Sequence, residues 1–201
     1  MIIIFYERLI NLFYKIKTRF FYSMFFGSIG KRSCIKNPLF IKNVHNVFIG
    51  DNFFIRDHAR IEVVGDGRIS FGDSVSIEQG FHITSGYEII IGNSVVISFG
   101  AMITDIDHNY KEINLRVLEQ RNIVRKTEIG DFCFIGAGVK IQAGTILGKQ
   151  CVVGANAVIR GSFPDYCVIV GIPGRIIKRF NIKTNQWEKT NERGEFINDL
   201  Q

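Results

Sequence analysis

The chain has 201 residues, of which 46% are hydrophobic, and this suits one folded domain with a buried core and a terminal appendage. Its formal net charge of +6 favours anionic partners without naming one. Nucleic acid is not expected among them, because the sequence contains no recognition helix, zinc finger or aromatic stacking motif.

Residues 1–30 differ from the rest of the chain because they are basic and rich in aromatic residues. Their apolar residues follow helical spacing, at Ile2, Phe5, Tyr6, Leu9, Phe13, Ile16 and Phe20. No apolar run reaches the roughly 18 residues of a membrane-spanning helix, and no small-x-small cleavage site of a signal peptide follows. We predict an amphipathic helix within an N-terminal segment of residues 1–44. Two roles stay open for it: contact with an anionic membrane surface, and a cap on the first coil of the domain that follows.

A six-residue repeat fills the chain between Ile49 and Ile159. Large apolar residues return at every sixth position within four blocks, which are Ile49, Ile55, Ile61; Phe71, Ile77, Ile83; Ile91, Ile97, Ile103; and Ile129, Ile135, Ile141, Leu147, Val153, Ile159. A helix cannot keep this spacing on one face, because its period is 3.6 residues. Hexapeptide repeats instead predict a parallel β-helix.

The repeat predicts an all-β domain of about five coils over residues 45–178. Each coil has three short strands, and its inward residues stack on the next coil at roughly 4.8 Å. We expect the glycine after many inward residues to give backbone freedom at a corner. Cys133 and Cys151 occupy the small inward slot and are predicted to be packing residues. The flat apolar sides of such a prism favour association into a closed ring.

The repeat stops between Ile103 and Ile129, where residues 109–128 form a loop too long for a corner. His108 opens this loop, and Asp105 and Asp107 flank it and could orient or polarise its ring. An imidazole with a pKa near 6.5 can take a proton from a hydroxyl and return it within one turnover. We therefore predict that His108 is a general base; the alternative is a polar loop histidine bonded to its own aspartates.

Two other groups of residues bear on chemistry. His82 and His108 together supply only two nitrogens, short of a three-ligand zinc site, so no metal is expected. Arg160, Arg175 and Lys178 follow the final coils, either as a solvated basic end or as a seat for phosphate groups. Residues 179–201 are predicted to form a polar tail, as a short hairpin or a loose segment.

Together these residues resemble the hexapeptide-repeat acyltransferases, in particular the branch of maltose, galactoside, nodulation and O-antigen O-acetyltransferases. The resemblance spans about residues 45–180 and rests on the repeats, ITDIDHNY at 103–110, IGDFCFIGAGVKIQAGTILG at 129–148 and VGIPGRIIK at 170–178. It implies a left-handed parallel β-helix, a homotrimer, and acetyl-CoA bound between neighbouring subunits. The left hand comes from the resemblance alone, because crossovers between parallel strands are otherwise right-handed.

The resemblance also implies roles for single residues. The family's catalytic histidine falls on His108, which would remove the proton of the acceptor hydroxyl as that oxygen attacks the acetyl thioester. The implied acceptor-binding residues are Glu78, Asp105 and Asp107, and the implied coenzyme-binding residues are Phe134, Ala137, Ala155, Arg160, Arg175 and Lys178. Glu78 stands where the family has a sugar-binding asparagine, and Gly86 where it has an aspartate, so we expect an acceptor other than galactosides or maltose.

The function implied is an acetyl-CoA-dependent O-acetyltransferase that acts on a sugar hydroxyl of a bacterial surface polysaccharide or of its lipid-linked precursor. We expect it in the cytoplasm, at the inner face of the membrane. One alternative is an N-acetyltransferase acting on a xenobiotic or an amino sugar. An alternative of another class is a membrane-associated β-helix scaffold without catalysis.

Overall fold

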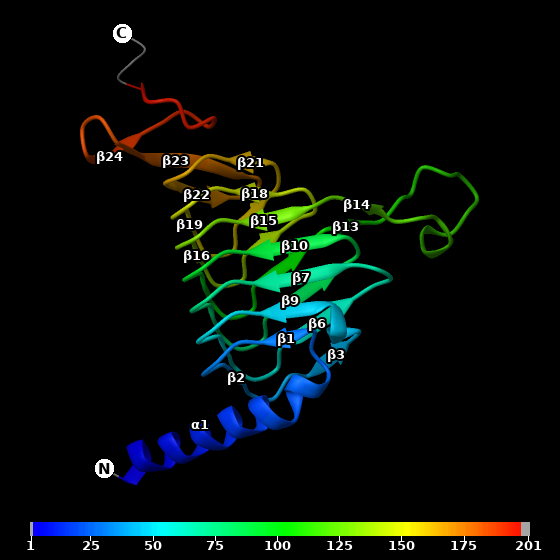
Figure 1. Ribbon diagram of the computed structural model, residues 1–201. Helices are drawn as coiled ribbons and strands as arrows, with labels where there is room; N and C mark the ends of the chain where they lie inside the picture. The colour runs from blue at the N-terminus through cyan, green and yellow to red at the C-terminus, as the bar shows by residue number, and fades with distance from the viewer. Residues whose placement is uncertain (1, 198–201) are drawn as a thin grey trace.

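The computed structural model describes residues 2–197, apart from the side chains of residues 2–5 and 7, and shows a prism of stacked coils with one helix at its N-terminal end (Figure 1). The side chains of Ile2 and Phe5, which belong to the predicted apolar stripe, and the last residues of the predicted tail lie outside this description. The all-β fold with an N-terminal helix and a long loop is confirmed.

Three sheets of parallel strands form the sides of the prism, and the chain visits them in turn. The first sheet has seven strands: β1 (Ser28–Ile29), β4 (Val47–Ile49), β7 (Arg68–Phe71), β10 (Glu88–Ile91), β15 (Thr127–Ile129), β18 (Ile146–Leu147) and β21 (Ser162–Phe163). The third sheet has six: β3 (Phe40–Lys42), β6 (Arg60–Val63), β9 (His82–Ser85), β12 (Met102–Thr104), β17 (Lys140–Ile141) and β20 (Val158–Ile159).

The second sheet has nine strands, because a hairpin extends it at the C-terminal end. Its parallel strands are β2 (Cys34–Ile35), β5 (Phe54–Ile55), β8 (Ser76–Ile77), β11 (Val96–Ile97), β16 (Phe134–Ile135), β19 (Val152–Val153) and β22 (Cys167–Gly171). The antiparallel strands β23 (Gly174–Asn181) and β24 (Gln186–Lys189) complete it. The predicted tail boundary at residue 179 therefore falls inside β23.

The β-helix begins at β1, well before residue 45. Ile29, Ile35 and Ile41 are themselves six residues apart and lie in β1, β2 and β3, which pair in parallel with the next coil. The segment predicted to be a cap over residues 1–44 thus contains a coil of its own. This coil adds β1 to the first sheet and β21 extends it beyond Ile159, so the sheet has two strands more than the five or so predicted coils require.

The inward residues of the hexapeptides form one continuous core. Ile77, Ile97 and Ile135 lie side by side in the second sheet, and each is fully buried. Burial of an isoleucine side chain stabilises a fold by about 2 kcal/mol, so the stack supplies most of the cohesion between coils. Cys133 and Cys151 are buried free thiols in the same core, as packing residues would be.

Where a glycine follows the inward residue, the reason at most corners is that there is no room for a Cβ. The reason is not a backbone conformation that only glycine adopts easily. At Gly130 a Cβ would lie 2.7 Å from the backbone of Gly148 in the next coil, and φ is not left-handed. Gly138, with φ at +68°, is a position where the conformational reason does hold. The close approach of neighbouring coils is therefore the main reason for the repeat's glycines.

Residues that directly follow several of these glycines form a ladder of side-chain hydrogen bonds from one coil to the next. Asp51 Oδ1 accepts the Lys31 N–H at 2.7 Å, and Asp73 Oδ1 accepts the Asp51 N–H at 2.7 Å. Asp131 repeats the contact further along, accepting the Asn93 N–H at 2.7 Å. Each acidic corner residue thus satisfies an amide of the preceding coil, which fixes the register of the stack.

Helix α1 (Ile2–Phe20) lies under the first coil, and one of its faces packs there (Figure 1). Thr18 Oγ1 accepts the Ile35 N–H at 2.8 Å, and Tyr22 and Phe26 are buried beyond the end of the helix. The opposite face of α1 is exposed. No helix in the described part of the chain is long and apolar enough to span a membrane.

Candidate active site

The long loop closes on a short two-stranded ribbon. After β12 the chain forms β13 (Ile106–Asp107), which pairs antiparallel with β14 (Ile123–Val124). His108 directly follows β13, so the ribbon holds it at the base of the loop that projects from the prism (Figure 1). A residue beside a paired strand is held more firmly than one at a loop tip, which suits a group that must keep one position.

The ring of His108 has one defined partner. Its Nδ1 lies 3.0 Å from Oδ1 of Asn122, the residue before β14 at the other end of the loop. An amide oxygen only accepts hydrogen bonds, so Nδ1 carries the proton when the ring is neutral. Nε2 is then the nitrogen with a free lone pair, and this is the state that a general base needs.

A groove of about 280 Å³ lies beside His108 on the outer face of the third sheet. Its polar lining comes from His82, Thr84 and Thr104 together with His108 and Asn122. Apolar side chains complete the wall, namely Val64, Met102, Ile103 and Ile106. The hydroxyls and imidazoles face a space that one sugar ring could occupy.

His82 forms part of the polar wall of this groove, and its surroundings favour the neutral imidazole. Its Nε2 lies 2.9 Å from Thr84 Oγ1, and the side chain is half-buried. Burial lowers the pKa of His82 from its ordinary value, and the nearby positive charge of Arg60 lowers it further. The groove therefore presents one neutral imidazole from the wall beside the candidate base.

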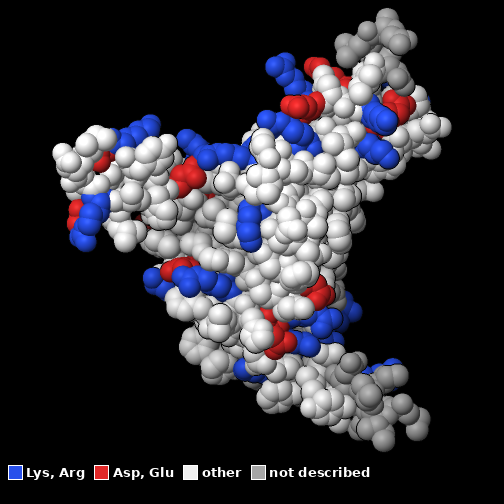
Figure 2. Space-filling model, turned by 180° about the vertical axis from the view of Figure 1, so that it is seen from behind, with Lys and Arg blue, Asp and Glu red and all other residues white. Residues whose placement is uncertain are grey.

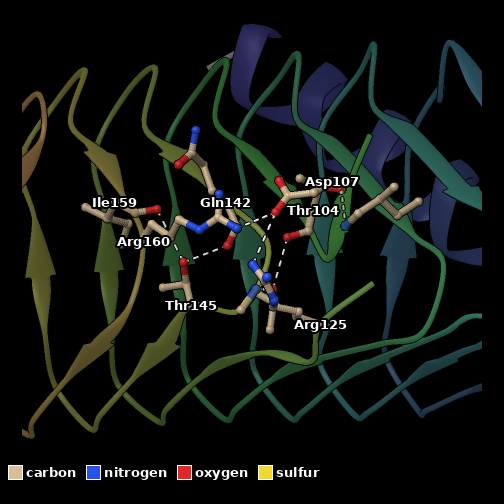
Figure 3. Close-up of polar contacts among 10 residues, drawn as sticks. Thr104, Asp107, Arg125, Gln142, Thr145, Ile159 and Arg160 are labelled. Carbon is tan, nitrogen blue, oxygen red and sulfur yellow. Dashed lines mark hydrogen bonds and ion pairs between the residues drawn. The ribbon is translucent and has the colours of Figure 1, made fainter. Parts of the chain in front are cut away.

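Asp107 lies at the centre of a charged cluster beside the groove (Figure 3). Its carboxylate forms ion pairs with Arg125, at 3.5 Å, and with Arg160. Successive residues of a strand point to opposite sides, so Asp107 faces away from the side that His108 takes. Two guanidinium groups on one carboxylate leave this flank with a net positive charge.

Asp105 has a different environment from the one expected of an acceptor-binding residue. It is fully buried, and its carboxylate accepts the Ser85 hydroxyl at 2.7 Å, the Gly86 N–H at 2.7 Å and the Tyr87 N–H at 3.0 Å. These bonds fix the turn after β9, next to the groove. Among the described contacts, the His108 ring is hydrogen-bonded to Asn122. It is bonded to neither of the flanking aspartates, Asp105 and Asp107.

Three of the other predicted site residues share a corner that is not the corner of His108. Glu78, Ala137 and Ala155 each follow a strand of the second sheet, at its junction with the third sheet. The Ala137 carbonyl accepts the Asn156 N–H at 2.8 Å, which joins its turn to that of Ala155 one coil further on. Glu78 pairs with Arg56 at 2.8 Å. His108 instead lies where the third sheet returns to the first.

Phe134 and the C-terminal cations lie on the second sheet. Phe134, in β16, points outward and is exposed. Arg175 and Lys178 are three residues apart, and a regular strand would send them to opposite faces. The bulge in β23 adds one residue between them, so both line a groove of about 560 Å³ beside β24. Arg175 also pairs with Glu192 at 3.0 Å.

Comparison with known proteins decides the family. The description "Bacterial transferase hexapeptide (six repeats)" matches residues 126–161. The Escherichia coli K12 protein WbbJ, named as a lipopolysaccharide biosynthesis O-acetyl transferase, is 36% identical over 79% of this chain and 85% of its own length. The chain belongs to the hexapeptide-repeat acyltransferases. Its fold is therefore the left-handed parallel β-helix that the resemblance implies.

A further relative agrees with this family, and solved structures agree with the fold. A Mycobacterium tuberculosis protein named as an acetyltransferase is 35% identical over 71% of this chain, which spans 44% of that relative. The solved N-acyltransferase AntD of Bacillus cereus, with dTDP and 3-hydroxybutyryl-CoA, has a TM-score of 0.71 at 21% identity, over 81% of this chain and 88% of its own. A galactoside acetyltransferase with coenzyme A has a TM-score of 0.58 at 21% identity, over 86% and 74%.

The candidate site contains residues that the sequence alone does not single out. Asn122 and Arg125 lie at the far end of the loop, and nothing in their local sequence indicates that they return to His108 and Asp107. Thr84 lines the groove only because β9 and β12 are paired. In the described part of the chain, no group of three or more His, Cys, Asp and Glu residues is placed to hold a metal ion.

Proposed function

We propose that this acyltransferase moves an acetyl group from acetyl-CoA to a sugar hydroxyl of a bacterial surface polysaccharide or of its lipid-linked precursor. The observation that carries the proposal is the His108 ring, with Nδ1 bonded to Asn122 and Nε2 left for a substrate beside a sugar-sized groove. The similarity to WbbJ supports a saccharide acceptor. The coenzyme A complexes of two structures with the same fold support the donor.

The chemistry needs one proton to move twice. Nε2 of His108 takes the proton of the acceptor hydroxyl as that oxygen bonds to the thioester carbonyl carbon. The C–S bond then breaks, and the coenzyme sulfur leaves with the proton that Nε2 returns. A positioned general base contributes about 10²–10⁴-fold to the rate. While the ring is charged, the Asn122 oxygen still accepts the Nδ1–H and stabilises the imidazolium.

The other site residues bind and position the substrates. Arg160, Arg175 and Lys178 attract the coenzyme phosphates, and Phe134 with the backbone at Ala137 and Ala155 contacts its pantetheine arm. Glu78 accepts a hydrogen bond from the acceptor. Asp107 holds Arg160 beside the His108 strand, which links the donor end of the site to the base. Asp105 contributes indirectly, through the turn that it fixes.

A homotrimer completes the site in this proposal. Within one chain, His108 lies at one corner of the prism, and Glu78, Ala137 and Ala155 lie at another. A ring of three prisms brings the first corner of each chain against the second corner of its neighbour. Donor, acceptor and base then meet at each of the subunit boundaries, which supplies rate by proximity. We place this trimer in the cytoplasm, with residues 1–30 at the inner face of the membrane.

The test is acetyl transfer by the purified protein to a panel of saccharides, nucleotide sugars and drugs, read by thiol release and by mass spectrometry of the product. We expect a saccharide to gain one acetyl group that mild alkali removes, since an ester is labile where an amide survives. His108→Ala should lower kcat by at least about 100-fold while the protein stays folded and trimeric. An alkali-stable product would show amine acetylation, and full turnover in His108→Ala would refute the assigned base.

A further inference from the structure

The positive charge of the molecule is concentrated at its N-terminal end. Residues 8–36 contain seven Lys and Arg residues and no Asp or Glu, whereas the rest of the chain has 18 Lys and Arg against 19 Asp and Glu. In Figure 2 the surface around α1 shows basic and uncharged side chains, and the acidic side chains in view lie over the coils and at the other end. The formal charge of +6 thus belongs to this end of the molecule.

These cations surround a pocket between α1 and the first coil. The pocket has a volume of about 310 Å³, and Lys15 and Arg19 line it from the helix. Lys31 and Arg32 line it from the turn between β1 and β2. In the described part of the chain, none of these four cations forms an ion pair with a carboxylate. Asp51, the nearest corner aspartate, is bonded to the backbone N–H of Lys31.

The corner ladder shows that Lys31 departs from the repeat. The equivalent corner positions of later coils hold Asp51, Asp73, Asn93, Asp131, Lys149 and Asp165. Most of these accept an amide of the preceding coil, but the first coil has no preceding coil, and α1 lies there instead. A carboxylate at this position would have no amide to accept. Lys149 shows that the corner also admits a lysine, and in the first coil Lys31 occupies it. The cation faces the pocket.

An apolar groove adjoins the cationic pocket. It has a volume of about 510 Å³, is lined by Phe13, Ile16, Lys17, Phe20, Phe21 and Met24, and shares Ile16 and Phe20 with the pocket. Phe13, Phe20 and Met24 expose 61%, 72% and 69% of their surface. Phe13, Ile16 and Phe20 lie opposite Thr18, on the face of α1 that the first coil does not cover, and the other apolar side chains follow the end of the helix. Exposed apolar patches of this size mark an interaction site.

We propose that the pocket binds the phosphate of an anionic phospholipid, with the apolar face of α1 inserted among the lipid chains. A phosphate alone would fit the four cations, but it would leave the adjoining apolar groove in water. A ligand with a phosphate attached to apolar chains fits both parts at once. The inference deepens the membrane contact of the proposed function, since it names the partner and the residues that recognise it.

The experiment is co-sedimentation of the full chain with vesicles. We expect binding to phosphatidylcholine vesicles that contain phosphatidylglycerol, and little binding to phosphatidylcholine alone. The fourfold variant Lys15→Gln, Arg19→Gln, Lys31→Gln and Arg32→Gln should bind at least about 100-fold more weakly. The control variant Lys111→Gln, Lys149→Gln, Lys183→Gln and Arg193→Gln removes the same charge elsewhere and should bind as the wild type does. If both variants lost vesicle binding equally, net charge alone would explain the binding and the proposed lipid site in the pocket would be wrong.

Two further measurements test whether a second copy of the chain covers the apolar groove, or free phosphate occupies the cationic pocket, in place of a lipid. The double variant Phe13→Ser, Phe20→Ser should also abolish vesicle binding, and the chain should keep its oligomeric state. If the oligomer dissociates instead, a second copy of the chain covers this face and the proposal fails. Inorganic phosphate at moderate concentration should not displace the protein from vesicles beyond its effect as salt, and full displacement would indicate a site for free phosphate. Vesicle binding is read without acyl transfer, and His108→Ala should retain it, so each proposal can fail alone.

Discussion

Asn122 determines which nitrogen of His108 is left free to act as the proposed base. Its amide oxygen, 3.0 Å from Nδ1, accepts the ring proton on that side and leaves Nε2 basic. The partner of a catalytic histidine sets its tautomer and orientation, much as partners of metal-binding histidines do, where their loss costs about 10–100-fold. Asn122 is thus a positioning residue in the proposed mechanism, since it acts through the ring and does not touch the substrate.

We predict that Asn122→Ala lowers kcat by about 10–100-fold and leaves KM for acetyl-CoA unchanged. Asn122→Asp should restore much of kcat, because a carboxylate also accepts the Nδ1–H. Its negative charge favours the imidazolium, so the acidic limb of the kcat profile should move to higher pH. Steady-state kinetics across pH would check this, and an unaltered kcat in Asn122→Ala would remove the positioning role.

Some of these residues can be predicted from the sequence, and others cannot. His108 is identifiable because it breaks a regular repeat, and Arg175 and Lys178 because they end a recognisable motif. Asn122 and Arg125 depend on how a loop closes, and the antiparallel pairing of β13 with β14 is not encoded in any period. Asp105 looks like a site residue in the sequence, but only burial shows that its carboxylate is fully used by the neighbouring turn.

At the scale of elements, the turn after β9 depends on that one buried carboxylate. Asp105 accepts hydrogen bonds from Ser85, Gly86 and Tyr87. Its removal leaves the two backbone amides without their acceptor, whereas the Ser85 hydroxyl can still donate to the Arg68 carbonyl at 3.0 Å. Hydrogen bonds to charged groups contribute about 1.5–3 kcal/mol each, and a buried donor without a partner is costly. This turn lies beside the candidate acceptor groove, but the Asp105 carboxylate is fully used by the turn and does not face the groove.

We predict that Asp105→Ala lowers the free energy of unfolding by about 3 kcal/mol, measured by urea denaturation. At a temperature where the variant is still folded, KM for the acceptor should change little, because Asp105 is buried away from substrates. Asp66→Ala, at an exposed turn, is the matched control and should change stability by less than about 0.5 kcal/mol. A large rise in acceptor KM with normal stability would instead assign Asp105 to acceptor binding.

The hexapeptide period predicts the elements well because each inward residue must be buried in the next coil. It fixes the strands of the three parallel sheets from β4 to β20 and the position of the long loop, but not the ribbon of β13 and β14 within that loop. The first coil is missed because Ile29 lies in the basic, aromatic segment of residues 1–30, which resembles a helix. Ile35 and Ile41 follow directly after that segment. The bulge in β23 and the ladder of corner aspartates are also missed, since both depend on contacts between strands.

At the scale of the whole molecule, the proposed function gives each chain two incomplete half-sites. The His108 corner has the proposed base and the groove, and the corner of Ala137 and Ala155 has the turns proposed for the coenzyme. A trimer would complete each site from two chains, and this is the central claim of the proposed function. Vesicle binding at the end that carries α1 would then hold all three sites at the same height above a membrane.

Mixed trimers test this claim most directly. His108→Ala removes the base, and Ala155→Trp blocks the coenzyme turn at an exposed position without touching the core. Each variant alone should be inactive. When the two are unfolded together and refolded, random assembly should give active sites at about one quarter of the subunit boundaries, because a boundary is complete only when each chain supplies its intact half. Activity near a quarter of the wild type is the predicted result. A mixture as inactive as its components would contradict the account.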